Sequence, residues 1–138
     1  MTEKSHNEKD QKLIDTARAL VKPRVLSKNV EAGKVGSAIL TKDGNVYTGI
    51  NIESDCDLGA CAEHVAIGSM ITAGEQDIDT VVAVNKDGKV ITPCGRCREY
   101  IYQVSGKNNT TRVLLRHGTV MTLEELLPIH WKTEIQHG

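Results

Sequence analysis

The sequence predicts a three-layer α/β/α sandwich, in which helices pack on both faces of a mixed sheet of about five strands. Three observations predict this fold. Asp43-Gly44 lies between two apolar runs, which is a strong hairpin signal. After that hairpin, strand-like apolar runs alternate with segments of helical periodicity, as they do where parallel strands are joined by helices. The length of 138 residues fits one domain with one core.

The first half of the chain is predicted to hold a helix, the hairpin and a second helix. Apolar residues recur at helical spacing over 10–21, and Pro23 marks the end of that helix. The strands of the hairpin span 35–40 and 46–52. The second helix spans 62–73 and is followed by a glycine, as helices commonly are.

The second half alternates strands with helices. The valine-rich run 80–85 predicts a buried strand, and a helix follows over 95–104. A further strand is predicted over 112–116, with a short edge strand over 119–121. The last helix, over 122–127, opens on a Thr-x-x-Glu capping box and is stopped by a proline.

The domain organisation is simple. Residues 1–9 are polar and are predicted to form a flexible N-terminal tail, and 10–138 a single domain. The N-terminus lacks the apolar stretch of a secretion signal, and the chain has no apolar run long enough to span a bilayer. We therefore expect a cytoplasmic protein.

Composition excludes several classes of partner. Seventeen Lys and Arg against eighteen Asp and Glu give a formal net charge of −1, which is not the basic footprint of a protein that binds nucleic acid or an anionic membrane. Phe is absent and aromatic residues are only 3% of the chain, too few for a platform on which single-stranded nucleic acid would stack. A small-molecule ligand is favoured.

The cysteines indicate a metal site. Without a secretion signal they are expected to be reduced. Cys94 and Cys97 are three residues apart at a predicted helix start, so both sulfurs can point the same way, and the helix dipole favours their thiolates. Two thiolates of this kind form half of a tetrahedral zinc site.

Cys61 opens the other predicted helix of this region and can supply a third thiolate if the two helix starts meet. Three protein ligands with one open position are typical of catalytic zinc, which lowers the pKa of a bound water. Glu63, two residues later, is a candidate general base and acid for that water. This requires Cys61 to lie at the N-cap, because in a regular helix Glu63 would point away from it.

Cys-x-Glu followed later by Pro-Cys-x-x-Cys is the signature of zinc-dependent nucleobase deaminases. The chain resembles the cytidine deaminase family in its three-cysteine form, over about residues 34–131. Further matches are Val35-Gly36-Ser37-Ala38, Gly49-Ile50-Asn51-Ile52-Glu53 and Leu126-Leu127-Pro128. The resemblance implies a zinc-dependent hydrolase of pyrimidine salvage that converts cytidine or deoxycytidine to uridine or deoxyuridine. It also implies a homotetramer.

Carried over by position, the resemblance implies that Asn51 and Glu53 bind the ribose and that the backbone of Ala62 contacts the base. Three cysteinates on Zn²⁺ leave a net negative charge, which positive or donating neighbours would offset. His64, Arg96 and Arg98 are the candidates for this role.

Two departures from the family bear on the substrate. Gly33 stands where the family usually has a Phe beside the pyrimidine, and the loop between Asn51 and Cys61 is about one residue short. Both features also resemble blasticidin S deaminase, which acts on a cytosine nucleoside antibiotic, although that relative lacks a Glu at the position of Glu53. Glu53, Asp55 and Asp57 could attract a cationic substrate group. Deamination of a modified or antibiotic nucleoside is therefore the alternative function.

Two non-catalytic interpretations remain open at this stage. Cys94 and Cys97 could be a redox pair, or the zinc site could be structural, with His64 or His117 as its fourth ligand. Trp131 could line the pocket or pack a terminus. Cys56 receives no role.

Overall fold

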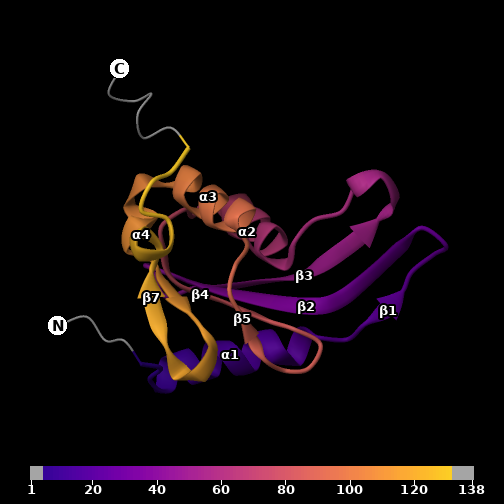
Figure 1. Cartoon of the computed structure of the whole chain (residues 1–138), viewed down its shortest axis with the longest axis horizontal. Coiled ribbons are helices and arrows are strands. Elements are labelled where there is room, and N and C mark those ends of the chain that lie inside the picture. Colours follow the sequence, from indigo (N-terminus) through magenta and orange to yellow (C-terminus); the bar gives the residue numbers. More distant parts are fainter. Residues whose placement is uncertain (1–4, 132–138) are drawn as a thin grey trace.

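The structure is a computed structural model that describes residues 5–131. A mixed sheet forms its central layer (Figure 1). Helix α1 (Glu8–Leu20) covers one face of the sheet, and α2 (Ala62–Thr72), α3 (Gly95–Val104) and α4 (Leu123–Leu126) lie on the other. The predicted three-layer fold is confirmed. Within the described residues, none of the helices combines the length and the apolar character that a membrane crossing requires.

The sheet of the described residues has seven strands rather than about five. Strands β2, β4, β6 and β7 are successive neighbours, β1 and β3 both pair with β2, and β5 pairs with β4. Only β4 and β6 run parallel. The strands are β1 (Arg24–Val25), β2 (Val30–Thr41), β3 (Val46–Ser54), β4 (Ile78–Val84), β5 (Val90–Ile91), β6 (Arg112–Leu114) and β7 (Val120–Thr122).

The strand count was too low for a physical reason. β1 and β5 are two residues long, and two residues carry no periodicity. β2 also starts five residues before the predicted position, because its register shifts between Ala32 and Gly36 and the shift interrupts the alternation of side chains. The predicted hairpin is confirmed, with Gly44 at a φ of 90° in its turn.

The first helix begins earlier than predicted. Asn7 caps it, accepting from the N–H of Asp10 at 2.9 Å, while the Asp10 carboxylate accepts from the N–H of Asn7 at 3.0 Å. α1 therefore starts at Glu8, inside the segment assigned to the tail, and Ser5 forms an isolated bridge with Thr119. Residues 1–4 lie outside the described residues.

Two apolar clusters form the core, one on each face of the sheet. Successive strand residues point to opposite faces. Thus Ile39 and Val81 join the cluster beneath α2 and α3, whereas Ala38 and Val82 join the cluster above α1. All four are at most 1% exposed. The buried strand predicted from the valine-rich run is therefore packed on both faces, by helices of both layers.

Two glycines, Gly49 and Gly59, allow close backbone contacts that position α2 against β3. A Cβ on Gly49 in β3 would lie 2.5 Å from the backbone nitrogen of Ala66 in α2, so the helix approaches the strand closely only because no side chain intervenes. A Cβ on Gly59 would lie 2.0 Å from the carbonyl oxygen of Ile52. There the chain returns to β3 after the 3₁₀ turn η1 (Asp55–Asp57), and the Ile52–Ala60 bridge leads directly into Cys61.

Candidate zinc and catalytic site

The site is built at the N-termini of two neighbouring helices. Cys61 is the N-cap of α2 and Cys94 the N-cap of α3, both with extended backbone. Each cap is followed three residues later by a second donor, His64 on α2 and Cys97 on α3. The condition placed on Glu63 is therefore met, because Cys61 precedes the regular part of its helix.

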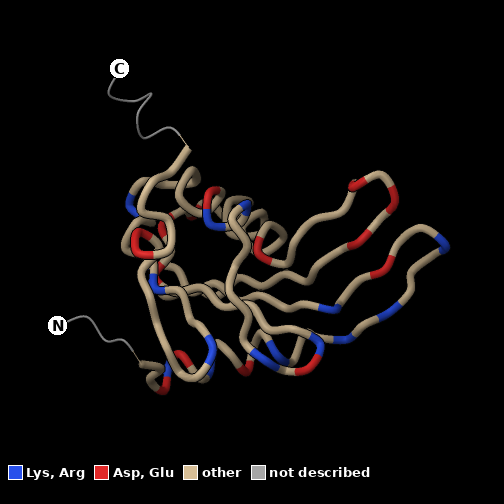
Figure 2. Tube along the Cα trace, in the orientation of Figure 1, with Lys and Arg blue, Asp and Glu red and all other residues tan. Residues whose placement is uncertain are grey.

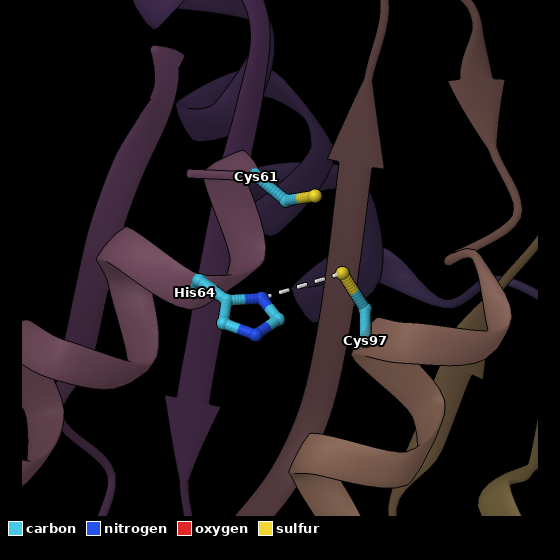
Figure 3. Close-up of side chains that lie close together, drawn as sticks. All are labelled: Cys61, His64 and Cys97. Carbon is cyan, nitrogen blue, oxygen red and sulfur yellow. Dashed lines mark hydrogen bonds between the residues drawn. The ribbon is translucent and has the colours of Figure 1, made fainter. Parts of the chain in front are cut away.

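The donor atoms lie at distances that suit a zinc ion. One ligand atom from each of Cys61, His64 and Cys97 lies within 4.8 Å of the others. Cys97 Sγ is 3.6 Å from His64 Nδ1 (Figure 3) and 3.6 Å from Cys94 Sγ. Ligands at about 2.3 Å for sulfur and 2.0–2.1 Å for nitrogen on a tetrahedral zinc are roughly 3.6–3.8 Å apart. The residues present fit this metal.

His64 contacts one of the site's cysteines, Cys97, through its ring nitrogen Nδ1. Its ring stacks on Tyr100, with centroids 4.4 Å apart and an interplanar angle of 13°, which fixes the direction of Nδ1. Burial lowers the pKa of His64, and the positive charge of Arg96 adds to this effect, so the neutral ring is favoured. The Cys-x-x-His spacing on α2, which repeats the Cys-x-x-Cys spacing on α3, was the sequence signal for this contact.

Glu63 is buried beside the metal-binding residues, with 5% of its surface exposed. Burial raises the pKa of its carboxyl group, while its own backbone N–H and the Cys97 side chain oppose the rise. A carboxyl group with a raised pKa can hold a proton as well as accept one. This is the property that a residue acting in turn as general base and general acid needs.

The two cysteines of α3 differ electrostatically. Burial alone would raise the pKa of Cys94, but hydrogen bonds from the backbone N–H groups of Cys97 and Arg96 and from the Cys97 side chain outweigh it, so the pKa is lowered. The pKa of Cys97 is raised, first by burial and then by the negative charges of Glu63 and Cys61. A cation bound among these donors would counter the repulsion between their negative charges and favour the thiolates.

A cavity of about 660 Å³ opens over this centre. It is lined by Cys61, Cys94, Cys97 and Glu63, whereas His64 does not line it. The volume lies within the range of small-molecule sites. The lining residues that the sequence did not single out include Ser54, Ala60, Ile91 and Thr92. Ile91 and Thr92 belong to the short β5 region, which no periodicity could have revealed.

Asn51, Glu53 and Ala62 also line this cavity. Asn51 is held in place, since its Oδ1 accepts from the N–H of Val35 at 2.9 Å and its Nδ2 donates to Glu53 Oε1 at 3.3 Å. Lys34 in turn donates to Glu53 Oε2 at 3.4 Å. The two side chains predicted to hold the ribose are therefore linked to each other and to β2.

The two arginines take different positions. Arg96 lines the cavity. Arg98 points instead to backbone carbonyls, with Nε donating to Pro93 at 2.9 Å and Nη1 to Leu126 at 3.2 Å. Arg98 thus connects the segment that carries Cys94 to the end of α4, through hydrogen bonds to backbone carbonyls rather than to a cysteine sulfur.

Three other residues singled out from the sequence lie outside the cavity lining. Trp131 is 66% exposed, and its backbone N–H donates to Glu99 Oε1 at 2.6 Å. His117 lies in the 3₁₀ turn η3 (Arg116–Gly118), away from the cysteines. Gly33 has a φ of 85°, and a Cβ there would lie 2.2 Å from the carbonyl oxygen of Lys22, so this backbone has no room for the Phe of the family.

Comparison with known proteins decides the family. Residues 7–112 match the model of the cytidine and deoxycytidylate deaminase zinc-binding region. The chain belongs to this family. Among the deaminases, it is 34% identical to blasticidin-S deaminase of Bacillus cereus over 70% of this chain and 76% of that protein. It is 32% identical to cytidine deaminase of Halalkalibacterium halodurans over 69% of this chain and 74% of that protein.

The crystal structure of cytidine deaminase from Mycobacterium leprae superposes with a TM-score of 0.73 at 29% identity. The match covers 90% of this chain and all of that deaminase. The family assignment favours a catalytic zinc over a structural zinc or a redox pair, since the cysteines and Glu63 belong to one family motif and share one cavity.

Proposed function

We propose that the protein is a zinc-dependent deaminase that hydrolyses cytidine or deoxycytidine to uridine or deoxyuridine and ammonia. One observation carries this proposal above the others. A buried glutamate and three cysteines from two helix N-termini line the same cavity, which is large enough for a nucleoside. This arrangement suits hydrolytic removal of an amino group from a ring carbon.

Cys61, Cys94 and Cys97 are the proposed zinc ligands, because all three line the cavity. When bound, zinc supplies a Lewis acid that makes water a nucleophile near neutral pH. His64 lies outside the cavity lining, so we assign it to Cys97 Sγ as a hydrogen-bond donor through Nδ1–H. A donor at this sulfur reduces the negative charge that three thiolates concentrate in one place.

Glu63 moves the proton. As a carboxylate it accepts a proton from the attacking water, and as a carboxylic acid it delivers that proton to the departing amino group. The overall balance is one water consumed and one ammonia released per nucleoside. Its burial supports this assignment, because burial raises the pKa of the carboxyl group and so helps it to hold the proton that it later delivers.

Binding of the sugar is assigned to the end of β3. The linked amide and carboxylate of Asn51 and Glu53 offer a donor and acceptors for ribose hydroxyls, at the rim of the cavity. The backbone of Ala62, at the start of α2, is proposed to contact the base. A nucleoside held at these points would have its ring directed toward Glu63, which lies next to Ala62 in the same helical turn.

The direct test is ammonia release from cytidine and deoxycytidine by purified protein of measured zinc content. We expect turnover with the native protein and a loss of at least about a hundredfold in kcat with Glu63→Gln at unchanged zinc content. Glu8→Gln, an exposed change on α1, is the matched control. Full activity of Glu63→Gln, or no turnover of either nucleoside by the zinc protein, would overturn the proposal.

A second substrate class is favoured by the acidic rim. Glu53 and Asp57 line the cavity, and acidic positions follow one another along the end of β3 and η1 (Figure 2). A cationic cytosine nucleoside such as blasticidin S would be attracted there. We expect Asp57→Asn to lower kcat/KM for blasticidin S while sparing cytidine. Equal effects on both substrates, without salt dependence, would argue against this second class.

Three wider properties are also proposed rather than observed. We infer a cytoplasmic enzyme of pyrimidine salvage that assembles as a homotetramer. Exposed apolar side chains support assembly, since Leu58 is 83% exposed, Val25 69% and Leu26 59%. Sedimentation equilibrium of the zinc protein tests this directly, and a monomer at micromolar concentration would contradict it.

A further inference from the structure

A second cavity, of about 460 Å³, lies on the α1 side of the sheet. It is bounded by the first turns of α1, the turn between β2 and β3, and the starts of β4 and β6. The cavity over Glu63 opens instead at the starts of α2 and α3, which lie on the opposite face of the sheet (Figure 1). No residue lines both cavities, so a ligand bound beside α1 would not occupy the nucleoside site.

Positive charge predominates in this second cavity. Lys9 and Lys12 reach it from α1, and Lys42 from the β2–β3 turn. Within the described residues, none of these three lysines forms an ion pair with a carboxylate. Three exposed lysines from two separate elements therefore line one concavity, and none of them has an ion-pair partner among the described residues.

The acidic residues of the cavity are already engaged. Both oxygens of Asp10 accept from Arg112 at 2.7 Å. Asp79 accepts from the hydroxyl of Thr80 at 2.6 Å. Of the two acidic residues that line the cavity, only Asp79 is not paired with an arginine or lysine. The cavity is therefore locally positive, although the chain as a whole has a formal net charge of −1. A concave, positively charged surface concentrates anions.

The remaining lining adds an apolar part and hydroxyl groups. Leu13, Leu40 and Val46 line the cavity, and Val46 is 48% exposed, so an apolar surface is open to a ligand. Thr16 and Thr41 also line the cavity, with hydroxyls that already bond to the Lys12 carbonyl and the Asn45 N–H. A volume of about 460 Å³ lies in the range of small-molecule sites and accommodates a ring system together with a phosphate chain.

We propose that this cavity binds a phosphorylated small molecule of nucleotide size, with its phosphates at Lys9, Lys12 and Lys42 and its ring on Leu40 and Val46. The site is separate from the deaminase centre. It favours anionic ligands, whereas the acidic rim of the first cavity favours cationic ones. The first cavity is lined by Glu53, Asp57 and Glu63 with Arg96 as its one arginine or lysine, whereas lysines border the second.

Titration calorimetry on the zinc-containing protein tests the proposal with two matched probes, inorganic pyrophosphate and ADP. Both carry a diphosphate, and only ADP carries a ring system. We expect both to bind at low ionic strength and ADP to bind more tightly. The double variant Lys9→Gln/Lys42→Gln should weaken both probes by at least about tenfold. Val46→Ser should weaken ADP alone.

The control removes the same charge elsewhere. Lys86→Gln/Lys89→Gln changes two exposed lysines in the β4–β5 turn, outside the cavity lining, and should leave both affinities unchanged. Absence of binding by either probe, equal weakening by the two double variants, or ADP no tighter than pyrophosphate would each overturn the proposal. The readout is binding, so the outcome does not depend on whether the protein deaminates cytidine.

Discussion

The guanidinium group of Arg112 on β6 donates two hydrogen bonds of 2.7 Å to the carboxylate of Asp10 on α1. Asp10 is 2% exposed, and the pair joins the first helix to β6 on the face of the sheet that α1 covers. Burial alone would raise the pKa of Asp10, but the hydrogen bonds and charge of Arg112, together with the backbone N–H of Asn7, lower it below its ordinary value.

Asp10→Asn is expected to destabilise the fold by about 3–5 kcal/mol at pH 7, because it leaves the Arg112 charge without its buried partner. The folded pKa of Asp10 lies below the unfolded one. Its stabilisation is therefore complete above the unfolded pKa and is lost as pH falls through the folded pKa. Urea unfolding of both proteins at pH 7 and at acid pH should show the difference shrinking on acidification.

Asp15→Asn is the control for this measurement, since Asp15 forms an exposed pair with Arg18 on the same helix. Exposed pairs contribute about 0–1 kcal/mol, so this variant should unfold much like the native protein. A difference between Asp10→Asn and native protein that stays constant from neutral to acid pH would contradict the linkage.

Gly49 and Gly68 give opposite expectations for the same substitution. Gly49→Ala should destabilise by about 1–3 kcal/mol, because the new methyl would overlap the backbone of α2 at Ala66 and Ala62. Gly68→Ala, within α2, has no neighbour within 4 Å of its Cβ and should stabilise by about 0.5–1 kcal/mol. Thermal unfolding of the two variants checks both signs, and equal shifts would refute the close approach of β3 and α2.

The ligand set can be determined with cobalt in place of zinc. Cys94→Ser should reduce the sulfur-to-metal charge-transfer absorption by about a third, because one of three thiolates is lost. His64→Gln should leave that absorption and the metal stoichiometry unchanged if His64 only donates to Cys97. The reverse pattern, with cobalt lost from His64→Gln and kept by Cys94→Ser, would assign the metal to Cys61, His64 and Cys97.

Arg98 is expected to act through the backbone it holds. Arg98→Ala removes the hydrogen bonds to Pro93 and Leu126, so the segment carrying Cys94 should lose its fixed position and zinc affinity should fall about 10–100-fold. Competition with a zinc chelator measures this. Arg116→Ala, which removes a comparable bond to the Val90 carbonyl, should leave zinc affinity unchanged. Unaltered zinc binding by Arg98→Ala would exclude the positioning role.

Much of the site followed from the spacing of a few residues. The Cys61 and Cys94 motifs predicted two helix N-termini, and both are N-caps in the structure. His64 was a candidate neighbour of the cysteines, but which sulfur it contacts, that of Cys97, depends on how the two helices approach each other. The same is true of Arg98, whose partners belong to the loop before its own helix and to α4, and could be identified only in the fold.

The errors in the fold have local causes. The first helix was started too late because its cap, Asn7 with Asp10, differs from the Ser/Thr-x-x-Glu pattern that marks α4. β1 and β5 were missed because two-residue strands exist only through the neighbour with which they pair. Gly33 was a departure from the family that only the backbone explained, through its positive φ and the nearby Lys22 carbonyl.

The pairing of donors at two helix starts also bears on how the molecule unfolds. Cys61 lies at the start of α2, and Cys94 and Cys97 lie at the start of α3, so the proposed ligands are separated along the chain by α2, β4 and β5. A metal ion bound by both segments would close that loop as a disulfide does. Unlike a disulfide, this cross-link would form without an oxidant and would be removed by a chelator. The metal that serves the reaction would thus also stabilise the tertiary structure, and this stabilisation would be lost when the metal is removed.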